Sequence, residues 1–344
     1  MYLEEYKRWL AADLEDADLN PELARIEGND EEIKDRFAVS LKFGTAGLRG
    51  VLGAGTNRMN IYVVRQATQG LANWVKTQGG NQTVAISYDS RIKSDVFAKV
   101  AAGVFAANGV SVNIWPVLMP VPTVSFATRY LHTSAGVMVT ASHNPGKYNG
   151  YKVYGPDGCQ IASEIADAIT QAIEGVDMFD DVRAMPFEDA QAAGFATYIQ
   201  EEVLDAFLDA VYDQHVEQEQ SDLRVVYTPL NGTGLECVTR ILERIGVTDV
   251  HVVEEQSKPD GNFPTCPYPN PEIREALECG IALCEQVHPD LLLATDPDAD
   301  RLGVYAKDTK TGEYVAFTGN MSGMLIAEYI LREKTATGTM PENP

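Results

Sequence analysis

The sequence is short of basic residues. Its 344 residues include 27 lysines and arginines against 50 aspartates and glutamates, which gives a formal net charge of −23. Because so acidic a surface repels phosphate backbones and anionic lipids, we expect neither nucleic acid nor an anionic membrane as a partner. Any site for an anionic ligand must therefore gather its few cations locally.

The sequence also lacks long apolar runs and paired cysteines. No stretch approaches the roughly 20 apolar residues of a membrane helix, and no apolar run follows Met1, so we expect neither a membrane span nor a signal peptide. The five cysteines are odd in number and form no Cys-x-x-Cys pair, which favours a reducing cytoplasm over a disulfide framework or a zinc site. In that compartment Asn81-Gln82-Thr83 and Asn231-Gly232-Thr233 match a glycosylation sequon only by chance. Nothing here implies a protein partner.

Alternating strand and helix patterns predict the fold class. At 45% apolar residues the chain can fill the cores of two or three domains. Apolar residues recur at helical spacing from Leu3 to Leu14, and Asn20-Pro21 has the form of a helix cap and first residue. The pattern then predicts helices over 61–78, 94–108, 122–131 and 163–173, and strands over 84–88, 110–114, 135–139 and 150–154. Such alternation is typical of an α/β fold with a largely parallel sheet.

The second half of the chain repeats this alternation. An irregular segment over 177–194 and a helix over 198–214 lead to the polar run 217–222. We then expect strands over 223–227, 250–253, 291–295 and 314–317, helices over 234–245, 272–287 and 322–332, and a proline-rich spacer over 258–271. The whole predicts tandem α/β domains with largely parallel, mixed sheets flanked by helices. We place these domains at 1–200 and 201–311, with the start of an incomplete third domain at 312–344.

A polar turn, Thr140-Ala141-Ser142-His143-Asn144-Pro145, follows the predicted strand Ala135–Val139. Ser142 therefore lies at the carboxyl end of a strand, where open α/β sheets bind ligands. A hydroxyl beside His143, with Lys152 a few residues on, is a candidate nucleophile near cations that favour phosphate. Taken alone, the segment is better explained as an ordinary Ser/Asn/Pro turn. A second motif reverses that preference.

This second motif is Asp296-Pro297-Asp298-Ala299-Asp300-Arg301, which follows the predicted strand Leu291–Thr295. In an extended segment the three carboxylates would share one face and repel one another. A hard divalent cation such as Mg²⁺ relieves the repulsion because it prefers oxygen ligands. Arg301 would then reach a phosphate held by that cation.

Three other interpretations of the aspartate motif were weighed. A calcium loop of the EF-hand type needs Gly and Glu where Arg301 and Lys307 stand, so it fails. A phosphatase with an Asp nucleophile, similar to the haloacid dehalogenase family, fits Asp296-x-Asp298 but needs downstream Lys and Asp motifs that we do not find. A solvated acidic turn stays open from this motif alone.

Together with Lys42-Phe43-Gly44-Thr45-Ala46-Gly47-Leu48-Arg49-Gly50, the two motifs resemble the α-D-phosphohexomutase family. They stand in the family's order and cover most of the chain. These enzymes move phosphate between the 1- and 6-positions of a hexose through a phosphoserine. The forms Gly-Thr-Ala-Gly-Leu-Arg-Gly and Asp-Pro-Asp-Ala-Asp-Arg resemble the longer subgroup of phosphoglucomutases and related phosphomannomutases and phosphopentomutases.

The resemblance implies a role for each candidate residue. Ser142 would carry the phosphate, whose oxygen would join the three aspartates around Mg²⁺. Lys152 is preferred over Arg49 for proton transfer because arginine is a poor base at its usual pKa. His143 would fix the substrate or the serine loop. The implied residues are Ser142, His143, Lys152 and Arg49 for catalysis; Arg301, Arg91 and Asn144 for substrate or phosphate; and Ser142, Asp296, Asp298 and Asp300 for the metal.

The resemblance implies a cytoplasmic Mg²⁺-dependent isomerase of the phosphotransferase type. We expect a phosphoglucomutase that interconverts glucose 1-phosphate and glucose 6-phosphate, with glucose 1,6-bisphosphate as intermediate and activator. A phosphomannomutase or phosphopentomutase is the alternative, and a sugar-phosphate-binding module is the non-enzyme alternative. The family's sugar-recognition loop and fourth domain have no match here. We therefore expect a truncated chain that binds Mg²⁺ but turns over sugar phosphates poorly.

Overall fold

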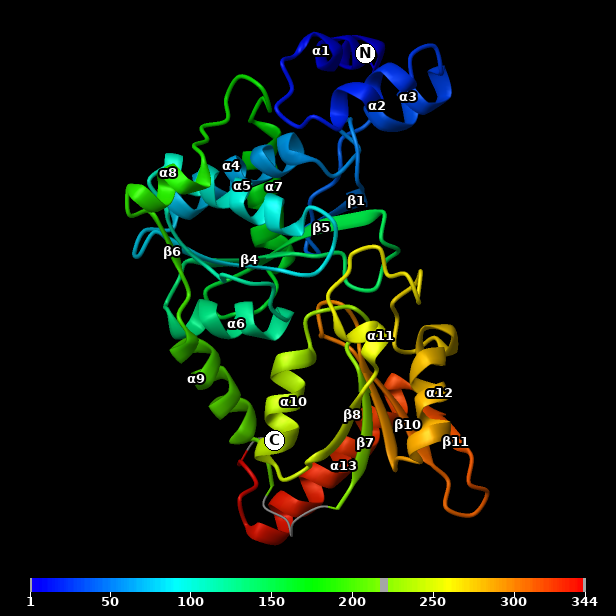
Figure 1. Cartoon of the computed structure of the whole chain (residues 1–344). Helices are drawn as coiled ribbons and strands as arrows, with labels where there is room; N and C mark the ends of the chain where they lie inside the picture. The colour runs from blue at the N-terminus through cyan, green and yellow to red at the C-terminus, as the bar shows by residue number, and fades with distance from the viewer. Residues whose placement is uncertain (1, 217–221, 343–344) are drawn as a thin grey trace. The chain divides into compact units, whose positions relative to one another are not determined.

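The computed structural model describes residues 2–216 and 222–342, so most of the polar run 217–222 lies outside the described residues. The chain divides into two compact units, which are described separately (Figure 1). Unit 1 comprises Met1–Ala141 and Gly146–Val203. Unit 2 comprises Leu204–Pro344 together with the short segment Ser142–Pro145. The three-domain division expected from the sequence stays a prediction.

Unit 1 is built on a six-stranded mixed sheet. Its strand order is β1-β5-β4-β2-β3-β6. Four strands run parallel because helices connect them, whereas β5 and β1 complete one side of the sheet antiparallel. The parallel strands are β2 (Thr83–Tyr88), β3 (Ser111–Ile114), β4 (Ala135–Val139) and β6 (Ala196–Tyr198). β5 (Tyr148–Tyr154) runs antiparallel to them, and β1 (Leu48–Val51) pairs antiparallel with β5.

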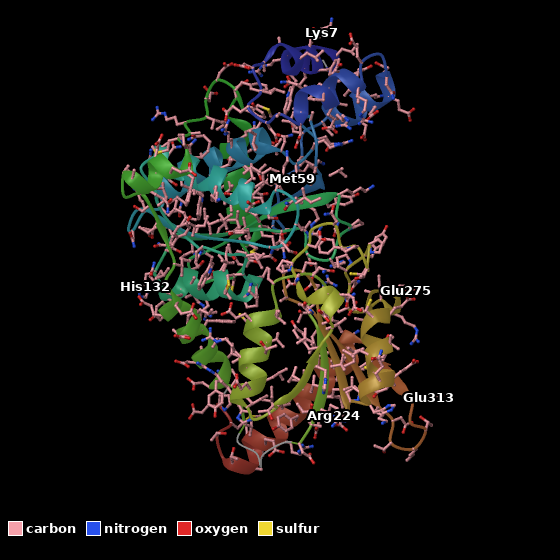
Figure 2. The ribbon with its side chains drawn as sticks, in the orientation of Figure 1. Lys7, Met59, His132, Arg224, Glu275 and Glu313 are labelled. Atoms are coloured by element: carbon pink, nitrogen blue, oxygen red, sulfur yellow. The ribbon has the colours of Figure 1, made fainter. Side chains whose placement is uncertain are left out.

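Helices cover both faces of this sheet. Figure 1 shows α4 (Ile61–Thr77), α5 (Ser94–Ala107) and α7 (Ser163–Glu174) on one face and α6 (Val121–Tyr130) on the other. The core between the sheet and the helices contains fully buried apolar side chains such as Ile86, Phe97 and Phe105. Figure 2 labels Met59 of this core, which is 1% exposed, and the exposed Lys7. The remaining helices of unit 1 are α1 (Tyr2–Ala11), α2 (Leu19–Arg25), α3 (Asp30–Phe37) and α8 (Phe187–Ala192), and α9 (Glu201–Tyr212) begins in unit 1 and continues into unit 2.

Unit 2 contains a five-stranded mixed sheet in the order β11-β10-β9-β7-β8. The strands β7 (Arg224–Thr228), β8 (Asp249–Val252) and β9 (Leu291–Thr295) are parallel. β10 (Leu302–Lys307) runs antiparallel to β9, and β11 (Tyr314–Phe317) pairs antiparallel with β10. Figure 1 shows α10 (Leu235–Arg244) and α12 (Glu278–Val287) on opposite faces. The other helices are α11 (Glu254–Ser257), the 3₁₀-helix η1 (Arg274–Leu277) and α13 (Gly319–Thr337). The predicted α/β class with mixed, helix-flanked sheets is confirmed.

Several predicted elements differ in detail. The second helix begins at Leu19 with Asp18 at its cap position, so Asn20 and Pro21 lie inside its first turn. Proline is tolerated there because first-turn N–H groups have no intrahelical partner. The segment 177–194 is not wholly irregular, since α8 forms within it, and the helix predicted over 272–287 is divided into η1 and α12. The strand predicted for a third domain, β11, pairs with β10 at the edge of the unit 2 sheet.

None of the helices in the described part of the chain has both the length and the apolar character required to cross a bilayer.

Candidate functional site

The predicted site residues divide between the two units. Arg49, Arg91 and Lys152 belong to unit 1. The serine segment and the aspartate turn both belong to unit 2, which contains Ser142, His143, Asn144, Asp296, Asp298, Asp300 and Arg301. Each group is described within its own unit.

The aspartate turn brings its three carboxylates together. One oxygen from each of Asp296, Asp298 and Asp300 lies within 4.8 Å of the others. Asp296 and Asp298 are fully buried, whereas Asp300 is exposed. The turn folds around Asp296, whose Oδ1 accepts hydrogen bonds from the backbone N–H groups of Asp300, at 3.2 Å, and Arg301, at 3.1 Å. The side chain of Arg301 is exposed.

Ser142 contacts this cluster directly. Its hydroxyl donates to Oδ2 of Asp296 at 2.8 Å, and its Oγ lies 3.2 Å from Nδ1 of His143. A serine has one hydroxyl proton, so while that proton points to Asp296 the imidazole must donate through Nδ1–H. Ser142 is 4% exposed and has a φ of 54°, a left-handed conformation that L-residues seldom adopt. His143 and the neighbouring Asn144 are half-buried.

The electrostatics of the turn fit a divalent cation. Burial raises the pKa of Asp296 well above its usual value, and the adjacent Asp298 and Asp300 carboxylates raise this pKa further. Burial and repulsion between like charges both disfavour ionised carboxylates in this turn. A hard cation with oxygen ligands would offset both, and three carboxylates with a nearby hydroxyl are the donor set that Mg²⁺ accepts. The residues present therefore fit the predicted metal.

A buried polar network lies beneath the strand that leads to Ser142. The parallel strands β2 and β4 are neighbours, so their carboxyl ends lie at one edge of the sheet. There Asp89 accepts hydrogen bonds from the hydroxyls of Thr140, at 2.6 Å, and Ser94, at 2.7 Å. The same network contains Arg91, whose Nε lies 3.3 Å from Asp89 and whose Nη1 donates to the carbonyl of Tyr148.

Arg91 therefore lies in the interior of unit 1. Its side chain and that of Asp89 are both 0% exposed. In this position it forms an ion pair with Asp89, and the substrate contact assigned to it from the sequence stays a prediction.

Arg49 and Lys152 share one face of the sheet. Arg49 in β1 pairs with Gly150 in β5, and Lys152 is two residues further along β5. Because side chains alternate along a strand, the two cations are diagonal neighbours. Lys152 is 5% exposed, whereas Arg49 is exposed. The turn before β1 requires Gly47, which has a φ of 74° and whose Cβ would lie 1.9 Å from the carbonyl oxygen of Tyr151.

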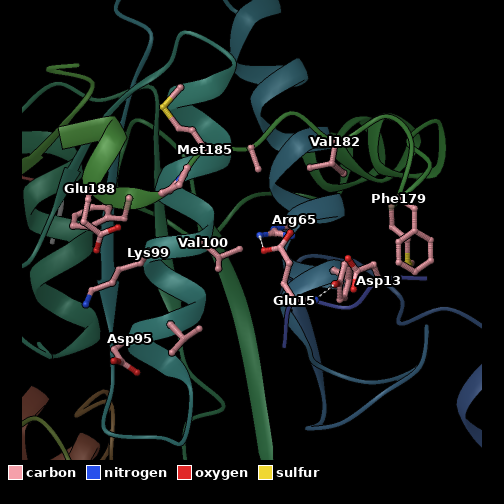
Figure 3. A pocket seen from close by; sticks show the side chains of 16 residues that line it. Asp13, Glu15, Arg65, Asp95, Lys99, Val100, Phe179, Val182, Met185 and Glu188 are labelled. Carbon is pink, nitrogen blue, oxygen red and sulfur yellow. Dashed lines mark hydrogen bonds and ion pairs between the residues drawn. The ribbon is translucent and has the colours of Figure 1, made fainter. Parts of the chain in front are cut away.

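A cavity of about 730 Å³ in unit 1 has no link to these groups (Figure 3). Figure 3 shows Arg65 and Glu15 beside each other in its wall, where they form an ion pair at 2.6 Å. Its lining includes none of the residues predicted from the sequence. We assign no role to it.

Sequence reasoning missed the residues that hold the two turns in place. Asp89 and Thr140 follow parallel neighbouring strands, and their polar character at two strand ends is the pattern that identifies them. Thr233, dismissed as part of a chance sequon, donates from its backbone N–H and its hydroxyl to the carbonyl of Pro297 inside the aspartate turn, each at 2.9 Å.

Comparisons with known proteins identify the family. Residues 40–179 match the family profile for phosphoglucomutase/phosphomannomutase, alpha/beta/alpha domain I, and residues 205–311 match the profile for domain II. The chain is 37% identical over 299 residues to a phosphoglucomutase of Staphylococcus haemolyticus, covering 86% of this chain and 54% of that protein. A Staphylococcus aureus phosphoglucomutase is 36% identical over 302 residues, covering 88% and 54% respectively. The chain thus spans about half the length of these curated relatives.

Solved structures give the same result. A Thermus thermophilus protein described as a candidate phosphomannomutase superposes with a TM-score of 0.69 at 27% identity, over 86% of this chain and 62% of that one. A phosphoglucomutase/phosphomannomutase family protein of Burkholderia thailandensis superposes with a TM-score of 0.66 at 25% identity, over 85% and 59% respectively. The family expected from the three motifs is confirmed, and the chain belongs to the phosphoglucomutase/phosphomannomutase family of phosphohexomutases.

Proposed function

We propose that this chain carries the phosphoserine and metal sites of a phosphoglucomutase that interconverts glucose 1-phosphate and glucose 6-phosphate. The observation that carries the proposal is the 2.8 Å hydrogen bond between Ser142 Oγ and Asp296, within a cluster of three carboxylates. Glucose is preferred to mannose or a pentose because the relatives at 36–37% identity are named phosphoglucomutases. A phosphomannomutase or phosphopentomutase is the alternative.

Ser142 accepts and returns the phosphoryl group. In the first half-reaction a base takes the proton of the sugar hydroxyl, the hydroxyl oxygen forms a new bond to phosphorus, and the bond between phosphorus and Ser142 Oγ breaks. The product is glucose 1,6-bisphosphate. The bisphosphate then turns, Ser142 Oγ forms a bond to its other phosphorus, and the bond between that phosphorus and the sugar oxygen breaks. The protonated base returns its proton to this oxygen, which regenerates the phosphoserine and releases the isomer. The imidazole of His143, 3.2 Å from Oγ, orients the serine.

The basic side chains have separate roles in the remaining steps. Lys152 takes the sugar proton, because a guanidinium such as Arg49 holds its proton at neutral pH. Arg49, on the same sheet face, orients the sugar hydroxyl. Arg301 and Asn144 bind phosphate oxygens. Asp296, Asp298 and Asp300 would hold Mg²⁺, which when bound supplies positive charge against the phosphoryl oxygens.

The experiment that tests this function is phosphosite mapping by mass spectrometry. The 344-residue protein is incubated with Mg²⁺ and glucose 1,6-bisphosphate, with S142A as the matched control. We expect one phosphate on Ser142 that is absent from S142A. This measurement follows a single phosphoryl transfer to Ser142, so it does not depend on full turnover.

The other outcomes separate the rival functions. Phosphate on Asp296 would indicate a phosphatase with an Asp nucleophile, and the mutase proposal would be wrong. Absence of any phosphoenzyme, together with retained Mg²⁺ binding, would favour a sugar-phosphate-binding module. Faster labelling with mannose 1,6-bisphosphate than with the glucose compound would move the assignment to a phosphomannomutase.

A further inference from the structure

The turn that follows β7 packs against the aspartate turn. This segment, Pro229–Gly234, is called the support turn below. β7 and β9 are parallel neighbours, with Thr228 opposite Ala294, so the segments that follow them leave the sheet at the same edge. The carboxylates of the aspartate turn therefore depend on a neighbour that is distant in the sequence.

Hydrogen bonds from Thr233 fix the backbone between two of the carboxylates. The backbone N–H and the side-chain hydroxyl of Thr233 both donate to the carbonyl oxygen of Pro297, each at 2.9 Å. Thr233 is 5% exposed, so neither bond competes freely with water. Pro297 lies between Asp296 and Asp298, and holding its carbonyl fixes the peptide that joins them.

Two glycines of the support turn leave no room for a side chain. A Cβ on Gly232 would lie 2.4 Å from Cα of Pro297 and 2.6 Å from its carbonyl oxygen, both backbone atoms. A Cβ on Gly234 would lie 2.4 Å from the Tyr227 hydroxyl and 2.6 Å from Oγ1 of Thr295, which are hydrogen-bonded to each other at 2.8 Å. Any larger residue at 232 must displace the aspartate turn.

The support turn is itself held rigidly. Leu230 and Asn231 adopt left-handed conformations, with φ values of 48° and 57°. Asn231 retains that conformation through its side-chain amide, which donates to the carbonyl of Lys258 at 2.9 Å, and through its backbone N–H, which donates to the carbonyl of Gln256 at 2.9 Å. A rigid support transmits its position to whatever packs on it.

We propose that Gly232 and Thr233 are positioning residues for the cation site, which set the spacing of Asp296 and Asp298 through Pro297. The proposal rests on the proposed function only in that a divalent cation binds the three carboxylates. Residues outside a metal's direct ligands commonly change its affinity ten- to a hundredfold when they are removed. We expect losses of that order here.

The test measures binding of Mn²⁺, a spectroscopic probe for Mg²⁺, by electron paramagnetic resonance on the full chain. T233V removes the hydroxyl and T233S keeps it, while G232A adds the methyl group that meets Pro297. G323A is the matched glycine control, because Gly323 lies in α13 with open space around its Cα. D298N removes a proposed ligand. Each variant is first compared with the wild type by circular dichroism and thermal melting.

We expect T233V and G232A to bind Mn²⁺ roughly tenfold or more weakly, T233S and G323A to bind like the wild type, and D298N to lose binding. Wild-type affinity in both T233V and G232A, with binding lost in D298N, would overturn the positioning role and leave the cation site intact. Weak binding in T233S or G323A would overturn the role as well, because the effect would then be a general sensitivity of the fold. Failure of the wild type to bind Mn²⁺ would overturn the cation site and this proposal with it.

Discussion

Folding of the metal-free chain and binding of a cation favour different protonation states of Asp296. Burial and two neighbouring carboxylates raise its pKa, so the metal-free fold favours its protonated form. A cation requires the ionised form. In the absence of metal, the contribution of Asp296 to stability is therefore greatest at low pH and falls as the pH rises from about 4 through its raised pKa.

The variant D296N tests this conflict. Asparagine keeps one oxygen to accept the backbone N–H groups of the turn, and its amide nitrogen, in place of Oδ2, can donate to the Ser142 oxygen, while the charge is removed. In EDTA at pH 8 we expect D296N to melt a few degrees above the wild type. In Mg²⁺ only the wild type gains stability, because binding to the folded state alone raises the melting temperature. Equal Mg²⁺-induced shifts in the two proteins, measured by scanning calorimetry, would contradict this prediction.

Asp89 provides a second prediction at the residue scale. D89N removes the carboxylate that lies 3.3 Å from Nε of the fully buried Arg91. Breaking a buried ion pair by removing one partner costs about 3–5 kcal/mol, so we expect a loss of that order in the free energy of unfolding. Urea denaturation checks it, with D180N as the control because Asp180 is 81% exposed in its ion pair with Arg8. Equal midpoints for D89N and D180N would show that the network is not coupled to stability.

Single residues were predicted well where a motif is local and poorly where partners are distant. The three aspartates are two residues apart, so their proximity follows from the sequence alone. Thr233 meets Pro297 across 64 positions, and only the parallel pairing of β7 and β9 brings them together. For Arg91, the sequence identified a position after a strand. It did not reveal that the side chain is buried beside Asp89, which also accepts a hydrogen bond from Thr140.

At the scale of elements, strong periodicity gave accurate boundaries. β4 and β9 have the predicted limits, and α4 begins at Ile61 as expected, where the Asn60 side chain caps it. Short elements were not predicted from the sequence: β6 has only three residues, and α8 has six. Their apolar patterns are too brief to register a period, and tertiary packing decides them.

The N-terminal helix gives a prediction at this scale. Arg8 in α1 donates to Asp177 at 2.8 Å, lies over the ring of Phe179 and so joins the helix to the segment after α7. Its hydrogen bonds lower the pKa of Asp177 to about 2. A lowered carboxyl pKa adds stability above about pH 4 that is lost as the pH falls toward 2.

We therefore expect D177N to be slightly less stable than the wild type at pH 7, by less than about 1 kcal/mol because the pair is partly exposed. The difference should narrow between pH 4 and pH 2. Nuclear magnetic resonance titration of Asp177 measures its pKa directly, and urea melts of both proteins across this range measure the coupling. A constant difference at all pH values would contradict the assignment.

At the scale of the whole molecule, α13 differs from the long helices of unit 1 in the burial of its side chains. It runs for 19 residues, and none of them is buried. Met324 is 72% exposed, Leu325 56% and Leu331 46%. Contiguous exposed apolar residues of this kind promote association between protein molecules.

We expect the 344-residue protein to self-associate reversibly through α13. Sedimentation velocity over a range of concentrations measures it, and the double variant M324E/L331E should shift the protein to monomer. V117E is the control, because it introduces the same acidic residue at Val117, an apolar residue of unit 1 that is 54% exposed. A monomer at all concentrations, or equal effects of the two substitutions, would rule out this role for α13.

The left-handed backbone of Ser142 has a consequence for the history of such sequences. Glycine or asparagine adopts a φ of 54° more readily than serine does, so replacement by either would relax the chain. A lineage released from selection for phosphoryl transfer would be expected to drift toward those residues. We therefore expect S142G to make a more stable inactive protein than S142A, because glycine adopts this conformation without strain.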